Sequence, residues 1–246
     1  MVINNFSSGA GLPDSELWLP IPQHFGTDDL DYKPVGAELA QFTFDRVKAQ
    51  CGFGPETIID LVATTETKAQ SLGGVAMLQT DHQGACGRYF FSESMYGTKK
   101  ETITYDQDLE NNPTNMIATF AHELSHALHN RSQENLEIEP ELYELLTDLT
   151  AVYLGYGVFL ANSRFEFSAY SDGSLQGWRA QGAGYLPESD LIFATAIFMQ
   201  IKDIAIEDAL SHLKPRLQKM LKKAFKQLSN YGAQIQVLKA KHPLEG

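Results

Sequence analysis

The segment AHELSHALH at residues 121–129 restricts what this chain can fold into more than any other part of the sequence. It contains the pattern HExxH. In an α-helix, residues four apart project from the same face, about 6 Å apart along the axis. His122 and His126 can therefore bind one metal ion, whereas Glu123 lies about 100° around the helix and outside the coordination shell.

A helix is expected here because a helix start precedes the motif. Asn112 can cap the first turn, Pro113 fits the first helical position, and apolar residues follow through Leu128. Histidine nitrogens are ligands of Zn²⁺, which lowers the pKa of a bound water toward about 7, so that a nearby carboxylate can take its proton. We therefore predict a zinc site with Glu123 as the general base of a hydrolytic reaction.

The third protein ligand is expected from the following helix. Glu144 lies 18 residues beyond His126, and Asp148 follows four residues later, so both carboxylates share one helix face. In one arrangement Glu144 binds the metal and Asp148 accepts the second ring N–H of His122 or His126. The reverse assignment, with Asp148 as the ligand, is the alternative. Either arrangement explains two acids on a face that contacts another helix, since buried acids need partners.

Small residues continue this face of the helix, at Ala151 and Gly155. Small side chains would let the helix approach the HExxH helix closely, as a shared metal requires. Tight helix packing without a metal is the alternative explanation.

Two further residues are candidates near the site. His129 lies about 10 Å along the axis from His122, so it is expected behind the ligands or on the surface rather than on the same metal. An oxyanion donor is expected from the Gly-rich segment GWRAQGAGYL, where Tyr185 and Arg179 are free to reach the site. A structural role for Tyr185 before Pro187 is the alternative.

The pattern of short β-branched segments followed by helices predicts an α+β fold. We expect a mixed sheet of three to four strands over the HExxH helix and a mainly helical C-terminal part. Strands are expected at residues 57–65, 74–80, 87–92 and 101–107. Helices are expected at 36–50, from Asn112, from Pro140 to about 161, from Pro187, and at 213–229.

The alternating segment 101–107 is expected at the edge of the sheet, with a cleft between it and the HExxH helix. An extended peptide could add to such an edge by backbone pairing. The expected division of the chain is an N-terminal wrap and helix (1–50), a zincin-like catalytic core (51–165) and a helical C-terminal subdomain packed on the core (166–246).

The composition of the chain limits the classes of partner that we expect it to bind. A net charge of −12 argues against nucleic acid. Cys51 and Cys86 are too few for a disulfide framework, and we expect two reduced, partly buried thiols. The start of the chain has no signal-peptide pattern, and the apolar stretch at 149–161 is too short to cross a bilayer. We therefore expect a soluble, cytoplasmic protein without a membrane partner.

The stretch at 213–229 is amphipathic. Apolar residues form one helical stripe, and lysines occupy the remaining positions. We interpret the lysines as a solvated helix face, with an acidic partner as the alternative.

Three segments together resemble a group of uncharacterised bacterial zincin-like proteins, the gluzincin-type metallopeptidases. They are AHELSHALH, ELLTDLTAVYLGYGVFLANS, and GYL before an Ala-rich helix. The likeness covers roughly residues 85–200. It implies His122, His126 and Glu144 as ligands of Zn²⁺, Glu123 as the base, and a helix pair against a small mixed sheet. The sequence departs from this family at His129, where its members tend to be apolar.

The leading functional hypothesis is a zinc-dependent hydrolase, most simply a metallopeptidase that acts on a peptide or protein substrate. A zinc-binding module with a zincin fold and a regulatory or binding role, without peptidase turnover, is the alternative. A metal-free structural protein is a third hypothesis. The sequence predicts neither the oligomeric state nor the choice between exo- and endo-action.

Overall fold

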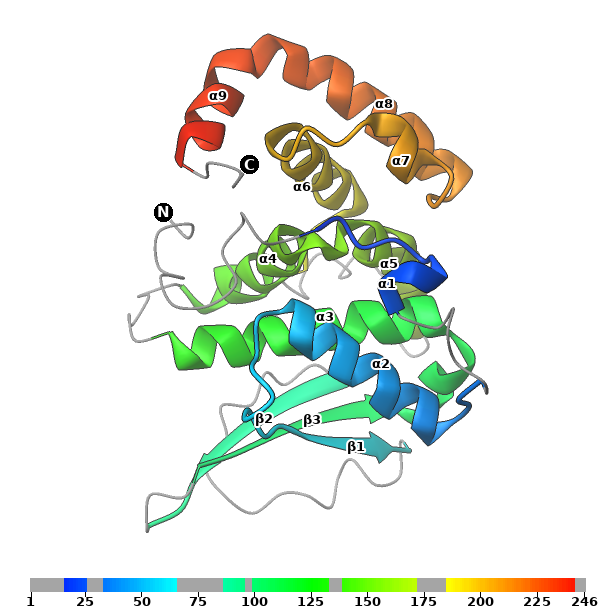
Figure 1. Cartoon of the computed structure of the whole chain (residues 1–246), viewed down its shortest axis with the longest axis vertical. Helices are drawn as coiled ribbons and strands as arrows, with labels where there is room; N and C mark the ends of the chain where they lie inside the picture. The colour runs from blue at the N-terminus through cyan, green and yellow to red at the C-terminus, as the bar shows by residue number, and fades with distance from the viewer. Residues whose placement is uncertain are drawn as a thin grey trace.

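The computed structural model describes residues 16–25, 33–65, 86–95, 99–132, 139–171 and 185–241 (Figure 1). The elements in chain order are α1 (Pro22–Phe25), α2 (Ala37–Gln50), β1 (Asp60–Thr64), β2 (Gly87–Glu93), β3 (Lys99–Asp106), η3 (Gln107–Asn111), α3 (Pro113–Arg131), α4 (Pro140–Ala151), η4 (Val152–Tyr156), α5 (Gly157–Ser171), α6 (Glu188–Ile201), α7 (Ile206–Leu210), α8 (Pro215–Leu228), η6 (Ser229–Tyr231) and α9 (Gly232–Lys241). The described part of the chain combines one small sheet with a larger helical part. The predicted α+β class is confirmed.

The sheet of the described residues has the order β1-β3-β2, with β1 parallel and β2 antiparallel to β3. The expected mixed sheet is therefore confirmed. The expectation that segment 101–107 lies at an edge is wrong, because β3 is the central strand. Its alternating sequence suggested one wet face, but Thr104 is buried along with Ile103 and Tyr105. The edge strand on the far side of β3 from β1 is β2, and the strand expected at 74–80 lies outside the described residues.

Helix α3 is the central helix of the fold. It lies between the sheet on one side and the kinked α4–η4–α5 segment on the other, with α2 beside it (Figure 1). Because neighbours surround it, nearly every side chain from Asn115 to Ala127 is buried, the polar ones included. Phe120, for example, makes edge-to-face ring contacts with both Phe44 of α2 and Tyr105 of β3. Burying one such side chain contributes roughly 1.5–3 kcal/mol.

The start of α3 follows from its sequence as predicted. The side-chain oxygen of Asn112 accepts a hydrogen bond from the backbone N–H of Asn115 at 3.3 Å, and Pro113 occupies the first turn. The helix runs to Arg131, three residues beyond the predicted apolar run. The two histidines of HExxH thus lie in the middle of a firmly anchored helix.

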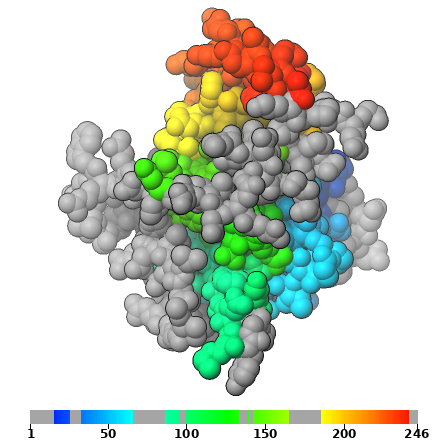
Figure 2. Space-filling view, turned by 90° about the vertical axis from the view of Figure 1, so that its left-hand side faces the viewer, coloured from blue at the N-terminus to red at the C-terminus, as the bar shows by residue number. Residues whose placement is uncertain are grey.

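The C-terminal helices also match the expectation. Helix α6 begins after Pro187 with Glu188 and Asp190 in its first turn, and α8 buries a stripe made of Leu217, Leu221, Ala224 and Leu228. Helix α8 packs on α6, and α8 and α9 form the end of the molecule opposite the β2–β3 hairpin (Figures 1 and 2).

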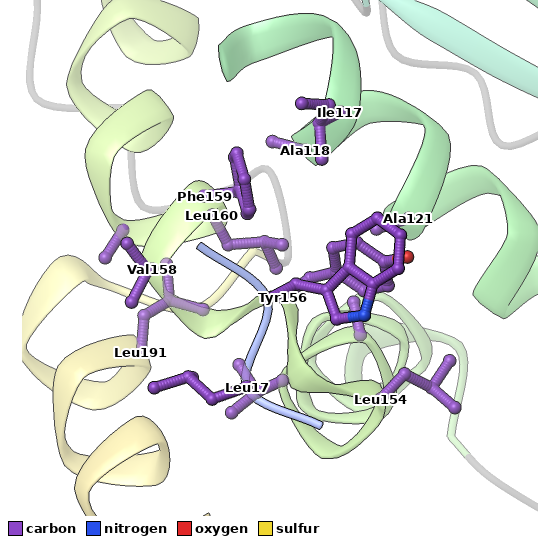
Figure 3. Close-up of a cluster of buried hydrophobic side chains, with 14 of the residues drawn as sticks. Leu17, Ile117, Ala118, Ala121, Leu154, Tyr156, Val158, Phe159, Leu160 and Leu191 are labelled. Atoms are coloured by element: carbon purple, nitrogen blue, oxygen red, sulfur yellow. The ribbon is translucent and has the colours of Figure 1, made fainter. Parts of the chain in front are cut away.

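The helix from Leu142 to Arg164 is long and apolar enough to cross a membrane, but 83% of its most apolar window is buried inside the fold. Figure 3 shows why: buried side chains from α3, η4, α5 and α6 gather there in one cluster. This burial is the pattern of a core helix in a soluble protein.

Gly155 has a different role from the one expected. It adopts φ +98°, inside a π-helical turn that offsets α5 from α4. A Cβ there would lie 1.8 Å from the carbonyl oxygen of Glu16, and the Gly155 carbonyl accepts a hydrogen bond from the Trp18 N–H at 3.0 Å. The absence of a side chain at Gly155 therefore leaves room for the N-terminal segment 16–18 to pack against η4. The expectation that its small size serves the approach to the HExxH helix is wrong.

Gly155→Ala should destabilise the fold by about 1–3 kcal/mol, because it combines a positive φ with a backbone clash. Gly232→Ala is the matched control, since Gly232 has a helical φ of −54° and a methyl group at its Cβ position would have no heavy atom within 4 Å. That change should be neutral or stabilise by up to about 1 kcal/mol. Urea unfolding of both variants checks this; equal stability of the two would contradict the role given to Gly155.

Candidate metal centre

Helices α3 and α4 pack side by side and bring three buried side chains together: His122 and His126 from α3 and Glu144 from α4. The Nε2 atoms of the two histidines are 3.1 Å apart. Glu144 Oε2 lies 3.1 Å from His122 Nε2 and 3.5 Å from His126 Nε2. The structure therefore joins the three residues that the sequence proposed as ligands, and it places Glu144 beside both nitrogens.

The proton on His122 is fixed by its other ring nitrogen. Nδ1 lies 3.0 Å from Asp148 Oδ1, and a carboxylate can only accept, so Nδ1 carries the hydrogen and donates it. In the neutral ring, Nε2 then presents a lone pair toward Glu144.

His126 is oriented in the same way. Its Nδ1 lies 3.4 Å from the hydroxyl oxygen of Thr147, and that hydroxyl donates its own hydrogen to the carbonyl of Tyr143 at 2.9 Å. Thr147 can therefore only accept from the histidine, so Nδ1 of His126 is also the protonated nitrogen. Its Nε2 lone pair faces the same point as that of His122.

Three electron-pair donors thus converge in a buried space, which is unfavourable unless a proton or a metal ion lies between them. A tetrahedral site with ligand bonds of about 2.0–2.1 Å has ligand–ligand edges of about 3.3–3.4 Å. The observed separations of 3.1, 3.1 and 3.5 Å are close to that spacing. Glu144 Oε1 has no hydrogen-bond partner among the described residues. The donor set therefore fits a metal ion.

The electrostatics of the ligands also call for a positive charge. Burial by itself lowers the pKa of His122, but hydrogen bonds with Asp148 and Glu144 outweigh it and raise that pKa to about 10. Burial opposes ionisation of Glu144, yet its contacts with His122 and His126 hold the pKa of Glu144 well below its usual range. The carboxylates favour a cation at this point, and a proton and a metal ion compete for it.

Asp148 takes the orienting position rather than a place beside both nitrogens. One of its oxygens binds His122 Nδ1, and the other accepts from the Arg164 guanidinium and from the backbone N–H of Leu186 at 2.8 Å. The Asp148 carboxylate that makes these contacts is buried. Asp148 therefore connects a ligand histidine to α5 and to the segment before α6.

Glu123 is buried beside the ligand histidines without belonging to the cluster. Its carboxylate accepts a hydrogen bond from the backbone N–H of Tyr89 in β2. The strand passes close to α3 here: a Cβ on Gly87 would meet the Glu123 side chain at 3.2 Å. Burial raises the pKa of Glu123, against the lowering effect of the two histidines. A raised carboxyl pKa suits a group that takes up and returns a proton near neutral pH.

A polar cluster fixes β2 against α3. The Tyr89 hydroxyl donates to Glu101 Oε1 at 2.7 Å and accepts from Asn130 at 3.1 Å. Arg131, at the end of α3, donates to both oxygens of the same Glu101 carboxylate. The backbone of Tyr89 is therefore held where it contacts Glu123.

Tyr185 lies next to His122, with ring centroids 5.2 Å apart, and the Arg164 guanidinium covers its ring at 4.8 Å. Burial and the carboxylates of Glu123 and Glu144 raise the pKa of Tyr185. Its hydroxyl therefore stays protonated and able to donate. The structure brings this residue to the site, as the sequence suggested.

His129 is buried but contacts none of the three ligands through a hydrogen bond. Its Nε2 lies 2.9 Å from the Thr150 hydroxyl, which donates to the Leu146 carbonyl, so Nε2 donates to Thr150. Burial lowers the pKa of His129 to about 4, so the ring is neutral. Tyr143 lies against both His129 and His126 and connects them by packing.

Sequence reasoning missed several residues of the site. Thr147 was detectable, because it lies one turn from Glu144 on the same helix face. Arg164 had a weaker signal, as a lone cation at the end of an apolar helix. The Tyr89 amide had none, since any residue supplies a backbone N–H. Arg179 lies outside the described residues.

The charge of the site favours a cation. Among the described residues here, the carboxylates of Glu123, Glu144 and Asp148 face the single guanidinium of Arg164, which leaves two negative charges when all are ionised.

Comparisons with protein-family models, curated proteins and solved structures found no match. The resemblance to zincin-like proteins stays a prediction, and the chemistry of the site follows from its own residues.

Glu144→Gln should abolish stoichiometric zinc binding, because the amide removes the charge that the cluster needs. Asp148→Asn should weaken binding by about 10- to 100-fold, because it disturbs only the orientation of His122. Isothermal titration with zinc, after removal of bound metal, measures both.

Glu101→Gln is the control, since it neutralises another buried carboxylate that pairs with Arg131 away from the cluster. It should lower stability and leave zinc affinity unchanged. Loss of zinc in Asp148→Asn together with near-normal affinity in Glu144→Gln would reverse the two roles.

Proposed function

We propose that this protein is a zinc-dependent hydrolase of the gluzincin type that cleaves peptide bonds, with Glu123 as the general base. The observation that carries the proposal is the placement of Glu123. Its carboxylate is buried next to two histidines that converge with Glu144, yet it is not one of the converging ligands. Core packing gives no reason for an acid there, because burial of a carboxylate is costly unless its chemistry is used.

His122, His126 and Glu144 would hold the ion. A bound Zn²⁺ supplies Lewis acidity, which polarises a carbonyl and makes a water molecule acidic enough to react at neutral pH. Glu123 would accept the proton of that water and pass it to the departing amine. The hydrogen bond from the backbone N–H of Tyr89 would hold the Glu123 carboxylate in place.

Tyr185 is the proposed oxyanion donor. It lies beside His122, its hydroxyl is protonated, and Arg164 holds its ring through a cation–π contact. A donor at this point would stabilise the negative charge that develops on the carbonyl oxygen.

The substrate is proposed to be an extended peptide that lies along β2. Among the described strands, β2 rather than β3 forms the edge of the sheet nearest the site, and its backbone reaches Glu123. Backbone pairing with an edge strand would align a scissile bond without demanding a particular side chain.

A metal-dependent binding module without turnover is the second candidate. The burial of all three ligand side chains favours it, since it limits access to the ion. The variants below separate the two functions.

Glu123→Gln should reduce peptide hydrolysis by at least about 100-fold while zinc remains bound, because the amide cannot accept the proton. The assay uses casein and a library of quenched fluorescent peptides, with zinc content measured on the same samples. Glu93→Gln changes an exposed glutamate on the edge strand and should retain activity. Equal hydrolysis by wild type and Glu123→Gln, at full zinc content, would contradict the proposed base.

Tyr185→Phe should lower kcat by about 10²–10³-fold with little change in zinc affinity, because only the hydroxyl is lost. Steady-state kinetics on a cleaved peptide measure the effect. A change confined to thermal stability would assign Tyr185 a structural role instead.

A further inference from the structure

The charges of this acidic chain are strongly segregated. Residues 209–244 carry eight of the 19 lysines and arginines of the chain and none of its 31 acidic residues. The basic residues concentrate on α8. Four of its lysines, the lysine face, are Lys219, Lys222, Lys223 and Lys226.

The lysine face has a regular geometry. Its members follow the spacing i, i+3, i+4, i+7, which places them on one side of a helix, and all four are exposed. The buried apolar stripe of α8 lies on the opposite side, by about 180° at 100° per residue. The outward side of α8 is therefore almost entirely cationic.

The lysine face has no ion-pair partner among the residues that the structure describes. Neighbouring cations do have partners: Arg216 pairs with Glu188, and Lys239 pairs with Asp203. The fold thus pairs a cation in the first turn of α8 and one in α9 with acids, and leaves the four exposed lysines of α8 to solvent.

The position of α8 sets this charge apart from the acidic remainder. Helices α8 and α9 form one end of the long axis, and the sheet lies toward the other end (Figures 1 and 2). Electrostatic interactions in physiological salt are screened over about 8 Å. A planar anionic surface at the α8 end would therefore interact with the lysines more than with the acids at the sheet end; the exposed acids near α8 include Glu207 and Asp208 of α7, which packs on α8.

We infer that the lysine face docks the protein on an anionic lipid surface. Four cations on the outward side of α8 can contact a plane together, and no groove is needed. The lysine ammonium is a point charge on a flexible side chain, which suits the spread negative charge of a lipid surface. Specific recognition of a single phosphate or carboxylate instead favours arginine, whose planar guanidinium donates two parallel hydrogen bonds. The face has no aromatic side chain for stacking on bases, which disfavours nucleic acid.

This contact is peripheral and differs from a membrane span. The apolar stripe of α8 packs into the fold, so the helix has no apolar face left to insert between lipids. The sequence led us to expect no membrane partner, because it has no spanning segment, and this inference departs from that expectation: docking through surface lysines is electrostatic, reversible and sensitive to salt. It does not depend on the metal centre.

Sedimentation with vesicles tests the inference. The full-length protein should bind phosphatidylcholine vesicles that contain about 30% phosphatidylserine, and it should not bind pure phosphatidylcholine. The double variant Lys222→Gln/Lys223→Gln should weaken binding by about 10- to 30-fold. The fourfold Lys→Gln variant of the lysine face should bind no better than wild type binds neutral vesicles.

Lys99→Gln/Lys100→Gln is the matched control, because it removes two adjacent exposed lysines at the start of β3 and changes the net charge equally. It should bind like wild type. Circular dichroism confirms that each variant is folded. Three results would overturn the inference: no binding of wild type to the anionic vesicles, an equal loss in both double variants, or binding to soluble polyglutamate but not to vesicles, which would indicate an acidic protein partner.

Discussion

Three electron-pair donors from two packed helices meet at one buried point, and the contacts around them favour a positive charge there, either a proton or a metal ion. His122 and His126 are fixed as Nε2 donors because Asp148 and Thr147 occupy their Nδ1 hydrogens. Without a positive charge, the lone pairs and the Glu144 carboxylate would repel one another in a region with little water. The orienting contacts therefore prepare the two nitrogens and Glu144 to hold a metal ion in place of a proton.

The fold supplies the rigidity that such a site needs. Helix α3 is enclosed by the sheet and by the α4–η4–α5 helix, so its side chains have few alternative rotamers. Hydrogen bonds also connect the site to neighbouring elements: Asp148 accepts from Arg164 and from the Leu186 amide, and Glu123 accepts from the Tyr89 amide. Contacts from α4, β2 and α5 therefore orient the ligand histidines, the proposed base and the proposed oxyanion donor, respectively.

The sequence predicted the parts that local physics determines. The cap at Asn112, the helical spacing of His122 and His126, and the shared face of Glu144 and Asp148 depend only on helix geometry. Prediction from the sequence failed where tertiary contacts determine the structure. The alternation in 101–107 could not reveal pairing on both sides of β3, and a small residue at 155 could not reveal a positive φ that admits the N-terminal segment. The contribution of Arg164 required knowing how the π-helical turn rotates α5.

X-ray absorption at the zinc edge, on protein purified without chelator, tests most directly whether the converging side chains hold a metal ion. We expect two imidazole nitrogens and further oxygen ligands at about 2.0–2.2 Å around the ion. A sulfur shell at about 2.3 Å, or a spectrum of zinc surrounded by water alone, would contradict this site.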